Sequence, residues 1–322
     1  MRAGLSPQMQ GHLAMLAFSA LVAGSFSLGS LAANQIAPTA LNTVRFFIAA
    51  IPIGILAWLT GGFTRVSLAA PWRYLVLGGL FATYFVLMFE GLKTAPPVST
   101  AAVFTLTPVM SALFGWWLLR QITTPRMALA LSIGAFGALW VIFRADISAA
   151  LAFQIGRGEA IYFAGCVAHA IFTPMLRKLN RGEPALVFTF WIMVAGFLCL
   201  SVWGWRDVWA TDWAALPGIV WITILYVSLA ASTMTFVLLQ IATQRLPSAK
   251  VMAYTYLTPS WVIIWEIGLG HGVPPALVLG GVALTFVALW LLLKDESGAG
   301  GGAPNQALPP TVALETSRRH QG

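Results

Sequence analysis

Polar and aromatic side chains recur at helical spacing within one strongly apolar stretch of the chain, residues 157–178. The following residues are separated by three or four positions: Tyr162, Cys166, His169 and Thr173. A helix would place all of them in one stripe on its surface. Such a stripe offers rings for stacking and hydroxyl and imidazole groups for hydrogen bonds, which suits the binding of a small molecule with one aromatic and one polar end.

Three other apolar stretches, around residues 72–92, 96–119 and 247–269, carry similar residues. Together they provide the candidate ligand-binding set: Tyr84, Met88, Phe104, Thr107, Tyr162, His169, Lys250, Tyr254, Thr258 and Trp261. Each has a structural alternative, because aromatic residues in apolar helices also serve packing, and threonine hydroxyls can bond to their own helix. The pattern therefore predicts either cavity lining or packing at each position.

The composition predicts where these stretches lie. The chain of 322 residues is 59% hydrophobic and 9% charged, against roughly 25% charged residues in soluble domains, so we predict a polytopic membrane protein. The net charge of +8 comes from residues set singly between apolar runs, which argues against nucleic-acid binding. Cys166 and Cys199 lie in apolar stretches, so neither a disulfide nor a metal site is expected, and no cofactor.

A helix needs about 20 apolar residues to cross a bilayer, and ten stretches qualify. They are residues 11–33, 39–60, 72–92, 96–119, 125–143, 157–178, 184–205, 214–240, 247–269 and 274–293. The first could instead be a signal peptide, since "SLGSLAANQ" resembles a cleavage site. Arg2 alone would form its positive region, and cleavage would leave unequal halves, so we favour a transmembrane helix. Residues 295–322 have a disordered composition and are expected to form a cytoplasmic tail.

The ionisable residues inside these spans are few. His169 lies halfway along its span, where a polar group is costly and either lines a cavity or bonds to another helix. Lys250 begins its span and either snorkels or meets a ligand carboxylate. Arg45 lies nearer the outer end of its span, so we expect it to snorkel or bond to a loop carbonyl, which is a structural role.

Charge outside the spans predicts the orientation. Thirteen Lys and Arg residues lie on the side that holds the N-terminus, and four on the other. Because positive residues accumulate in cytoplasmic connections, we expect a multi-pass protein of the cell (inner) membrane with both termini cytoplasmic.

A repeated motif predicts the architecture. Leu-Thr-Pro occurs at Leu106–Pro108 and, 151 positions later, at Leu257–Pro259, and Phe-Val-Leu recurs at the same offset. Five spans is an odd number, so the second half must enter the membrane from the opposite side. We predict an all-α membrane protein with ten transmembrane helices in two inverted-topology five-helix repeats, residues 1–150 and 151–294. Pro108 and Pro259 interrupt the helical hydrogen bonds and are the predicted hinges.

With these features the chain resembles the drug/metabolite transporter superfamily, EamA branch, whose members have ten helices in two inverted halves. The resemblance rests on "VRFFIAA", with Arg45-Phe46 in the family's Arg-Phe position, and on both Leu-Thr-Pro motifs. Within the branch the chain is most similar to the YddG-type exporters of aromatic amino acids. It departs from many members where they carry Gly-Glu: here those places read Arg120-Gln121 and His271-Gly272, so no role of that glutamate carries over.

The resemblance implies export of aromatic and other neutral amino acids by alternating access through a central cavity between the repeats. Glu90, Glu159 and Glu266 fall near the ends of spans, which disfavours a carboxylate proton relay and favours facilitated export. The partners expected are a small-molecule substrate and the lipid bilayer. Because each chain contains both halves, a monomer is expected to suffice.

Other functions remain open at this point. An exporter of drugs or other small amphipathic metabolites would share the fold. An intramembrane enzyme would need a catalytic cluster, but the chain has no HExxH, no Asp-rich motif and no phosphate-binding loop. A receptor or structural subunit would be expected to carry an extramembrane domain. Since Tyr256 and Trp261 stand where the first repeat has Thr105 and Met110, we expect a substrate ring nearer residues 247–269 than residues 96–119.

Overall fold

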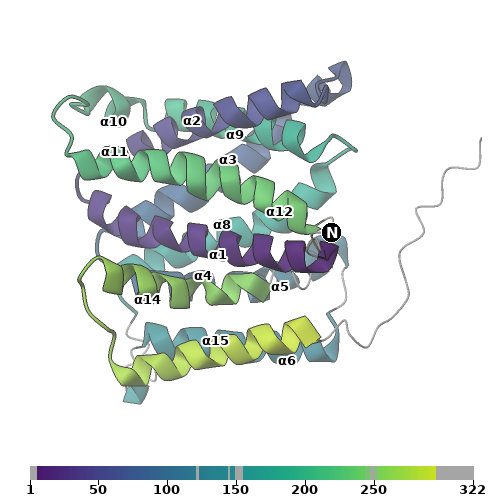
Figure 1. Cartoon of the computed structure of the whole chain (residues 1–322). Coiled ribbons are helices and arrows are strands. Elements are labelled where there is room, and N and C mark those ends of the chain that lie inside the picture. Colours follow the sequence, from purple (N-terminus) through teal and green to yellow (C-terminus); the bar gives the residue numbers. More distant parts are fainter. Residues whose placement is uncertain are drawn as a thin grey trace, which may run out of the picture.

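The structure is a computed structural model that describes residues 6–120, 123–143, 146–148, 155–243, 245–246, 251 and 253–294. Every regular element in this part of the chain is helical, and the long helices lie side by side along one common direction (Figure 1). The α-helices are α1 Pro7–Ala32, α2 Pro38–Leu59, α3 Trp72–Gly91, α4 Pro97–Phe104, α5 Thr107–Leu119, α6 Pro125–Ile142, α8 Arg157–Leu179, α9 Ala185–Trp203, α10 Trp205–Ala210, α11 Gly218–Leu225, α12 Thr235–Thr243, α14 Thr258–Gly268 and α15 Ala276–Lys294. Two 3₁₀ segments, η1 Arg65–Leu68 and η3 Tyr254–Leu257, and one π-helix, η2 Tyr226–Met234, complete the list.

Within the described residues, nine helices are long and apolar enough to cross a membrane. They coincide with nine of the ten predicted spans to within a few residues, counting α4 with α5 and α11 with η2 and α12 as single crossings. The remaining span, 247–269, is represented by η3 and by α14, which has 11 residues. The described residues therefore confirm nine spans, and the tenth remains a prediction.

The sequence marks where several helices begin. Pro7, Pro38, Pro97 and Pro125 each occupy the first position of a helix, where the missing N–H costs nothing and the fixed φ favours the helix. The Ser6 and Thr124 hydroxyl oxygens accept hydrogen bonds from the backbone N–H groups of Met9 and Met127, both at 3.2 Å. Such caps satisfy donors that the first turn leaves free.

At both Leu-Thr-Pro motifs the α-helical hydrogen-bond pattern is interrupted: residues 105 and 106 form a turn before α5, and the 3₁₀ segment η3 runs directly into α14. Leu106 has φ −77° and ψ −17° before α5, and Leu257 has φ −79° and ψ −13° before α14. The new helix starts at the threonine in each case, and proline follows as its second residue. The helices continue across Pro52 in α2 and Pro174 in α8, so only the repeated prolines accompany a break.

Glycines bring the N-terminal helices α1–α6 close to the C-terminal helices α8–α15. A Cβ atom added to Gly91 in α3 would lie 2.7 Å from the carbonyl oxygen of Gly158 in α8. In the same way, a Cβ on Gly137 in α6 would lie 2.7 Å from the carbonyl oxygen of Gly281 in α15. Backbones that approach this closely pack tightly without large side chains, as in other membrane helix pairs.

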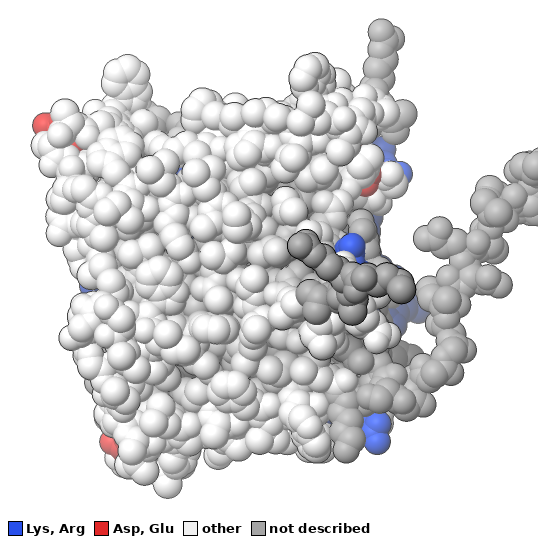
Figure 2. All heavy atoms as spheres, in the orientation of Figure 1, with Lys and Arg blue, Asp and Glu red and all other residues white. Residues whose placement is uncertain are grey.

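The surface supports a membrane location. A broad band across the middle of the face in Figure 2 is nearly free of Lys, Arg, Asp and Glu. Tryptophans near helix ends are exposed, and they include Trp58, Trp116, Trp117 and Trp209. Exposed apolar surface of this extent is stable only when lipid covers it.

Candidate functional site

A cavity of about 250 Å³ lies at the centre of the bundle. Its wall is built by α1, α2, α3, α4, α8, α9, η2 and α12, with Val251 and Thr255 at one edge. A larger hollow of about 640 Å³ lies between α2 and α9, but apart from the indole of Trp58 its lining is wholly apolar. Of these two hollows among the described residues, the central cavity is the one that combines apolar surface with polar groups that could orient a ligand.

Helix α3 supplies one aromatic side of this cavity. Phe81, Tyr84, Phe85 and Met88 all line it, and their spacing places them on a single helical face. The rings of Phe81 and Phe85 lie 4.7 Å apart in an edge-to-face arrangement. The face presents a continuous aromatic surface at the level of the cavity.

Helix α8 adds aromatic side chains next to those of α3, with the same spacing along the helix. His169, Phe172, Thr173 and Leu176 line the cavity. The ring of His169 lies 4.6 Å from that of Tyr84, and Phe172 stacks on Phe81 at 4.8 Å with an interplanar angle of 11°. Rings at these distances attract each other, so α3 and α8 form one aromatic wall.

The polar side of the cavity centres on Arg45 of α2. Its side chain is 1% exposed, and Nε and Nη2 donate to the Ser232 hydroxyl at 3.1 and 3.0 Å. The guanidinium carbon also lies 3.5 Å from the centre of the Phe85 ring, a cation–π contact. The expectation that Arg45 would snorkel or bond to a loop carbonyl is wrong: it turns into the bundle, because the π-helix η2 brings Ser232 opposite it.

The predicted residues of the N-terminal half and of α8 fall into two groups. Tyr84, Met88, Phe104 and His169 line the cavity. Tyr162 lies behind the wall, where its hydroxyl is 3.0 Å from the Tyr84 hydroxyl. Thr107 is buried at the first position of α5 and does not line the cavity.

Three predicted residues of span 247–269, Tyr254, Thr258 and Trp261, do not line the cavity. The Tyr254 hydroxyl is 2.9 Å from Nδ1 of His12, and the Trp261 indole N–H donates to the Ser19 hydroxyl at 3.0 Å. Thr258 is buried at the start of α14, and Lys250 lies outside the described residues. The aromatic wall belongs to α3 and α8, which does not support a substrate ring near this span.

Apart from the Tyr84 phenol, the ionisable groups of the described cavity wall are basic. None of its described residues is Asp or Glu; Arg45 and His169 are its basic groups. Among the residues that the structure describes, no three His, Cys, Asp or Glu side chains are placed to hold a metal ion. Two features were not predicted from the sequence: the inward turn of Arg45, which depends on the distant Ser232, and the π-helix η2.

Comparison with known proteins identifies the family. The model of the EamA-like transporter family matches residues 9–143 and, a second time, residues 156–294. The chain belongs to the EamA-like transporter family.

Relatives of this EamA protein share most of its length. The uncharacterized transporter YyaM of Bacillus subtilis (strain 168) is 24% identical over 274 residues, which cover 84% of this chain and 90% of YyaM. The uncharacterized transporter YetK of the same organism is 21% identical over 291 residues, covering 87% and 88% of the two chains. One protein of known crystal structure, 19% identical, superposes with a TM-score of 0.63 over 89% of this chain and 96% of that one, which shows a shared fold. The protein is therefore a multi-pass membrane transporter with a small-molecule substrate.

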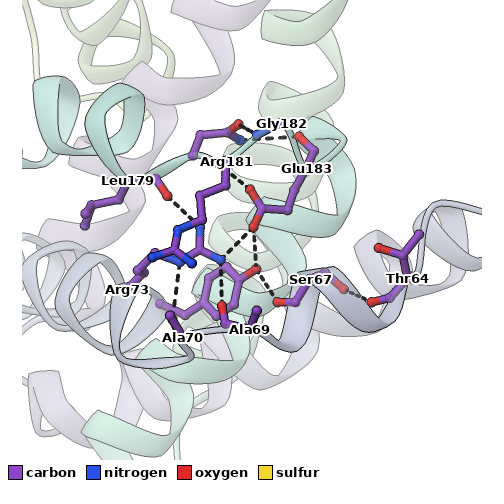
Figure 3. A network of polar contacts seen from close by, with 11 residues as sticks. Thr64, Ser67, Ala69, Ala70, Arg73, Leu179, Arg181, Gly182 and Glu183 are labelled. Carbon is purple, nitrogen blue, oxygen red and sulfur yellow. Dashed lines mark hydrogen bonds and ion pairs between the residues drawn. The ribbon is translucent and has the colours of Figure 1, made fainter.

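A second polar cluster of this EamA protein joins its two matched regions at one end of the bundle (Figure 3). Arg73 of α3 donates to Oε1 of Glu183 at 2.7 Å and to the carbonyl oxygen of Leu179 at 2.6 Å. Partial burial alone would raise the pKa of the Glu183 carboxyl. Hydrogen bonds from Arg73 and from the backbone N–H of Arg181, with the Arg73 charge, instead hold that pKa below its ordinary value. The cluster fastens the start of α3 to the connection between α8 and α9.

Proposed function

We propose that this protein exports aromatic and other neutral amino acids through the central cavity. The observation that carries the proposal is the aromatic wall of α3 and α8 with the hydrogen-bonded Arg45–Ser232 pair beside it. A substrate ring would lie against the aromatic wall of α3 and α8, while the polar end of the substrate would meet charged and hydroxyl groups.

Within this proposal, Tyr84, Met88, Phe104 and His169 contact the substrate, and Tyr162 positions Tyr84. Of the other predicted substrate-binding residues, Thr107, Tyr254, Thr258 and Trp261 do not line the cavity and are given no substrate contact in this proposal, and Lys250 lies outside the described residues. Pro108 and Pro259 are the proposed hinges, at which α5 and α14 would bend relative to the segments before them.

Transport would proceed by alternating access between two inverted repeats, residues 1–150 and 151–294. The matching backbone angles at the two Leu-Thr-Pro breaks support equivalent repeats. Two complete halves in one chain make a monomer sufficient. The excess of Lys and Arg on one side supports an inner-membrane location with both termini, and the tail 295–322, in the cytoplasm.

We further propose that export is facilitated rather than driven by a carboxylate relay, because the described cavity wall holds no Asp or Glu. His169 is then the group to test for proton coupling. Counterflow in proteoliposomes should respond little to a pH gradient. A strong response that disappears in His169→Gln would overturn this mechanism.

A second candidate is export of drugs or other amphipathic metabolites, favoured by the many apolar residues of the cavity wall. A panel of radiolabelled compounds in proteoliposomes separates the two. The proposal expects uptake of phenylalanine and tryptophan, with threonine as a neutral amino acid that lacks a ring. Failure of every aromatic amino acid alongside uptake of amphipathic drugs would contradict it.

A further inference from the structure

The guanidinium of Arg45 is held in place but is incompletely bonded. Of the five N–H donors of a guanidinium, one on Nε and one on Nη2 reach the Ser232 hydroxyl, whereas Nη1 is buried and bonds to no described residue. A buried charged donor without a partner is costly. An arginine kept only for structure would be expected to have its donors satisfied, so this one is suited to an acceptor that arrives with the substrate.

The π-helix fixes the orientation of this group. The Ser232 hydroxyl donates to the carbonyl oxygen of Val227, five residues earlier, at 2.7 Å, and so turns its lone pairs toward Arg45. The Phe85 ring, 3.5 Å from the guanidinium carbon, covers one face. With one edge and one face occupied, the guanidinium keeps a defined edge for a planar two-oxygen acceptor such as a carboxylate.

The charges around Arg45 are unbalanced. The described wall residues from α1, α8, α9, α12 and η3 that could hydrogen-bond are neutral hydroxyl groups and the imidazole of His169. No described wall residue is an acid that could pair with a substrate ammonium. The cavity therefore favours negative charge on its ligand.

We propose that Arg45 and Ser232 form the anion-binding subsite of the cavity, and that its substrates are apolar or aromatic monocarboxylates in which an ammonium group is tolerated but not required. This inference rests on the proposed function, since it assigns the polar end of the same cavity. It also extends the substrate class from amino acids to their deaminated relatives.

Competition among three compounds of equal ring size tests the inference on the unmodified full chain in detergent. Phenylalanine carries both charges, 3-phenylpropionate lacks the ammonium and phenethylamine lacks the carboxylate. Phenylpropionate should displace labelled phenylalanine about as well as phenylalanine does. Phenethylamine should be at least about 30-fold weaker, because it cannot pair with the buried guanidinium.

Variants then test whether Arg45 is responsible. Arg45→Gln should abolish the preference for phenylpropionate over phenethylamine, and Ser232→Ala should weaken phenylpropionate while leaving phenethylamine unchanged. Arg206→Gln, which removes a cation stacked on Trp205 outside the cavity, should behave like the unmodified chain. If gel filtration shows that Arg45→Gln does not fold, the inference is judged from the competition of the three compounds on the unmodified chain and from the effect of Ser232→Ala.

The outcomes separate the two proposals. If phenylalanine binds and phenethylamine competes equally, the anion subsite is wrong and amino-acid export stands. If labelled phenylpropionate binds and phenylalanine does not, the subsite stands and amino-acid export is wrong. If neither labelled compound binds, both are overturned.

Discussion

Tyr84 has an aromatic ring and a hydroxyl group that make separate contacts. Its ring lies 4.6 Å from that of His169, and its hydroxyl lies 3.0 Å from that of Tyr162. The ring therefore belongs to the wall, whereas the hydroxyl belongs to a buried hydrogen bond behind it.

Tyr84→Phe separates these roles. The substitution keeps the ring, so transport should persist, but it leaves the buried Tyr162 hydroxyl without this partner and should cost about 1–3 kcal/mol of stability. Thermal unfolding in detergent and amino-acid uptake measure the two effects. Loss of uptake with unchanged stability would show that the hydroxyl, and not the ring, serves transport.

Glu183 predicts how stability depends on pH. Because its folded-state pKa lies below the ordinary carboxyl value, its contribution is present above the ordinary pKa and is lost as the pH falls through the folded pKa. The melting temperature of the unmodified protein should therefore fall when the pH is lowered below about 5. Glu183→Gln should have a lower melting temperature at pH 7, and its melting temperature should change less between pH 7 and acidic pH. Glu90→Gln, which removes a partly exposed ion pair with Lys93, is the control and should change little. Parallel curves for all three proteins would contradict the role of Glu183.

Residue types alone revealed part of the site. His169 could be chosen because ionisable residues in the middle of apolar spans are uncommon and often functional, and Tyr84 because it places a ring and a hydroxyl near the middle of its span. Arg45 could not, because its choice between snorkelling outward and turning inward depends on Ser232, which lies 187 positions away in the sequence.

At the scale of helices, neighbouring glycines in α3 provide a matched pair. A Cβ on Gly78 would lie 2.5 Å from the backbone nitrogen of Gly196 in α9, whereas a Cβ on Gly79 has nothing within 4 Å. Gly78→Ala should push the helices apart and cost about 1–3 kcal/mol, while Gly79→Ala should be neutral or slightly stabilising. Melting temperatures of the two variants measured side by side check this. An equal effect of both would mean that α3 and α9 are not in backbone contact.

Helix positions were largely predictable, but their interruptions were not. Long apolar runs and first-position prolines determine most helix limits, since both act locally. Of Pro52, Pro108, Pro174 and Pro259, all inside spans, only Pro108 and Pro259 follow an interruption of the α-helix, whereas Pro52 and Pro174 lie in continuous helices. The π-helix η2 leaves no such local mark in the sequence, and its contact with Arg45 through Ser232 joins residues 187 positions apart.

At the scale of the whole molecule, the orientation can be tested with single cysteines. Cys166 is buried and Cys199 is half-buried, so both would first be replaced by alanine. Arg181 and Asp212 are exposed residues on either side of α9. Arg181→Cys should react with an impermeant maleimide only after permeabilisation, and Asp212→Cys should react on intact cells. The reverse pattern would invert the proposed topology.

The arrangement of the halves explains why a cavity forms where it does. Helices from both matched regions surround it, so relative movement of the two regions would open it to one side or the other. The repeat in the sequence was enough to predict a cavity between the two halves. Which helices form its wall could be known only from how α3 and α8 pack.

Counterflow of radiolabelled phenylalanine into proteoliposomes preloaded with unlabelled phenylalanine tests the central claim most directly. The unmodified protein should accumulate label, and Tyr84→Ala should lower apparent affinity on the order of tenfold because the wall loses a ring. Tyr254→Phe, which alters a hydroxyl bonded to His12 away from the cavity, should retain counterflow. Absence of counterflow with the unmodified protein, or an equal loss in both variants, would contradict a central aromatic cavity that transports amino acids.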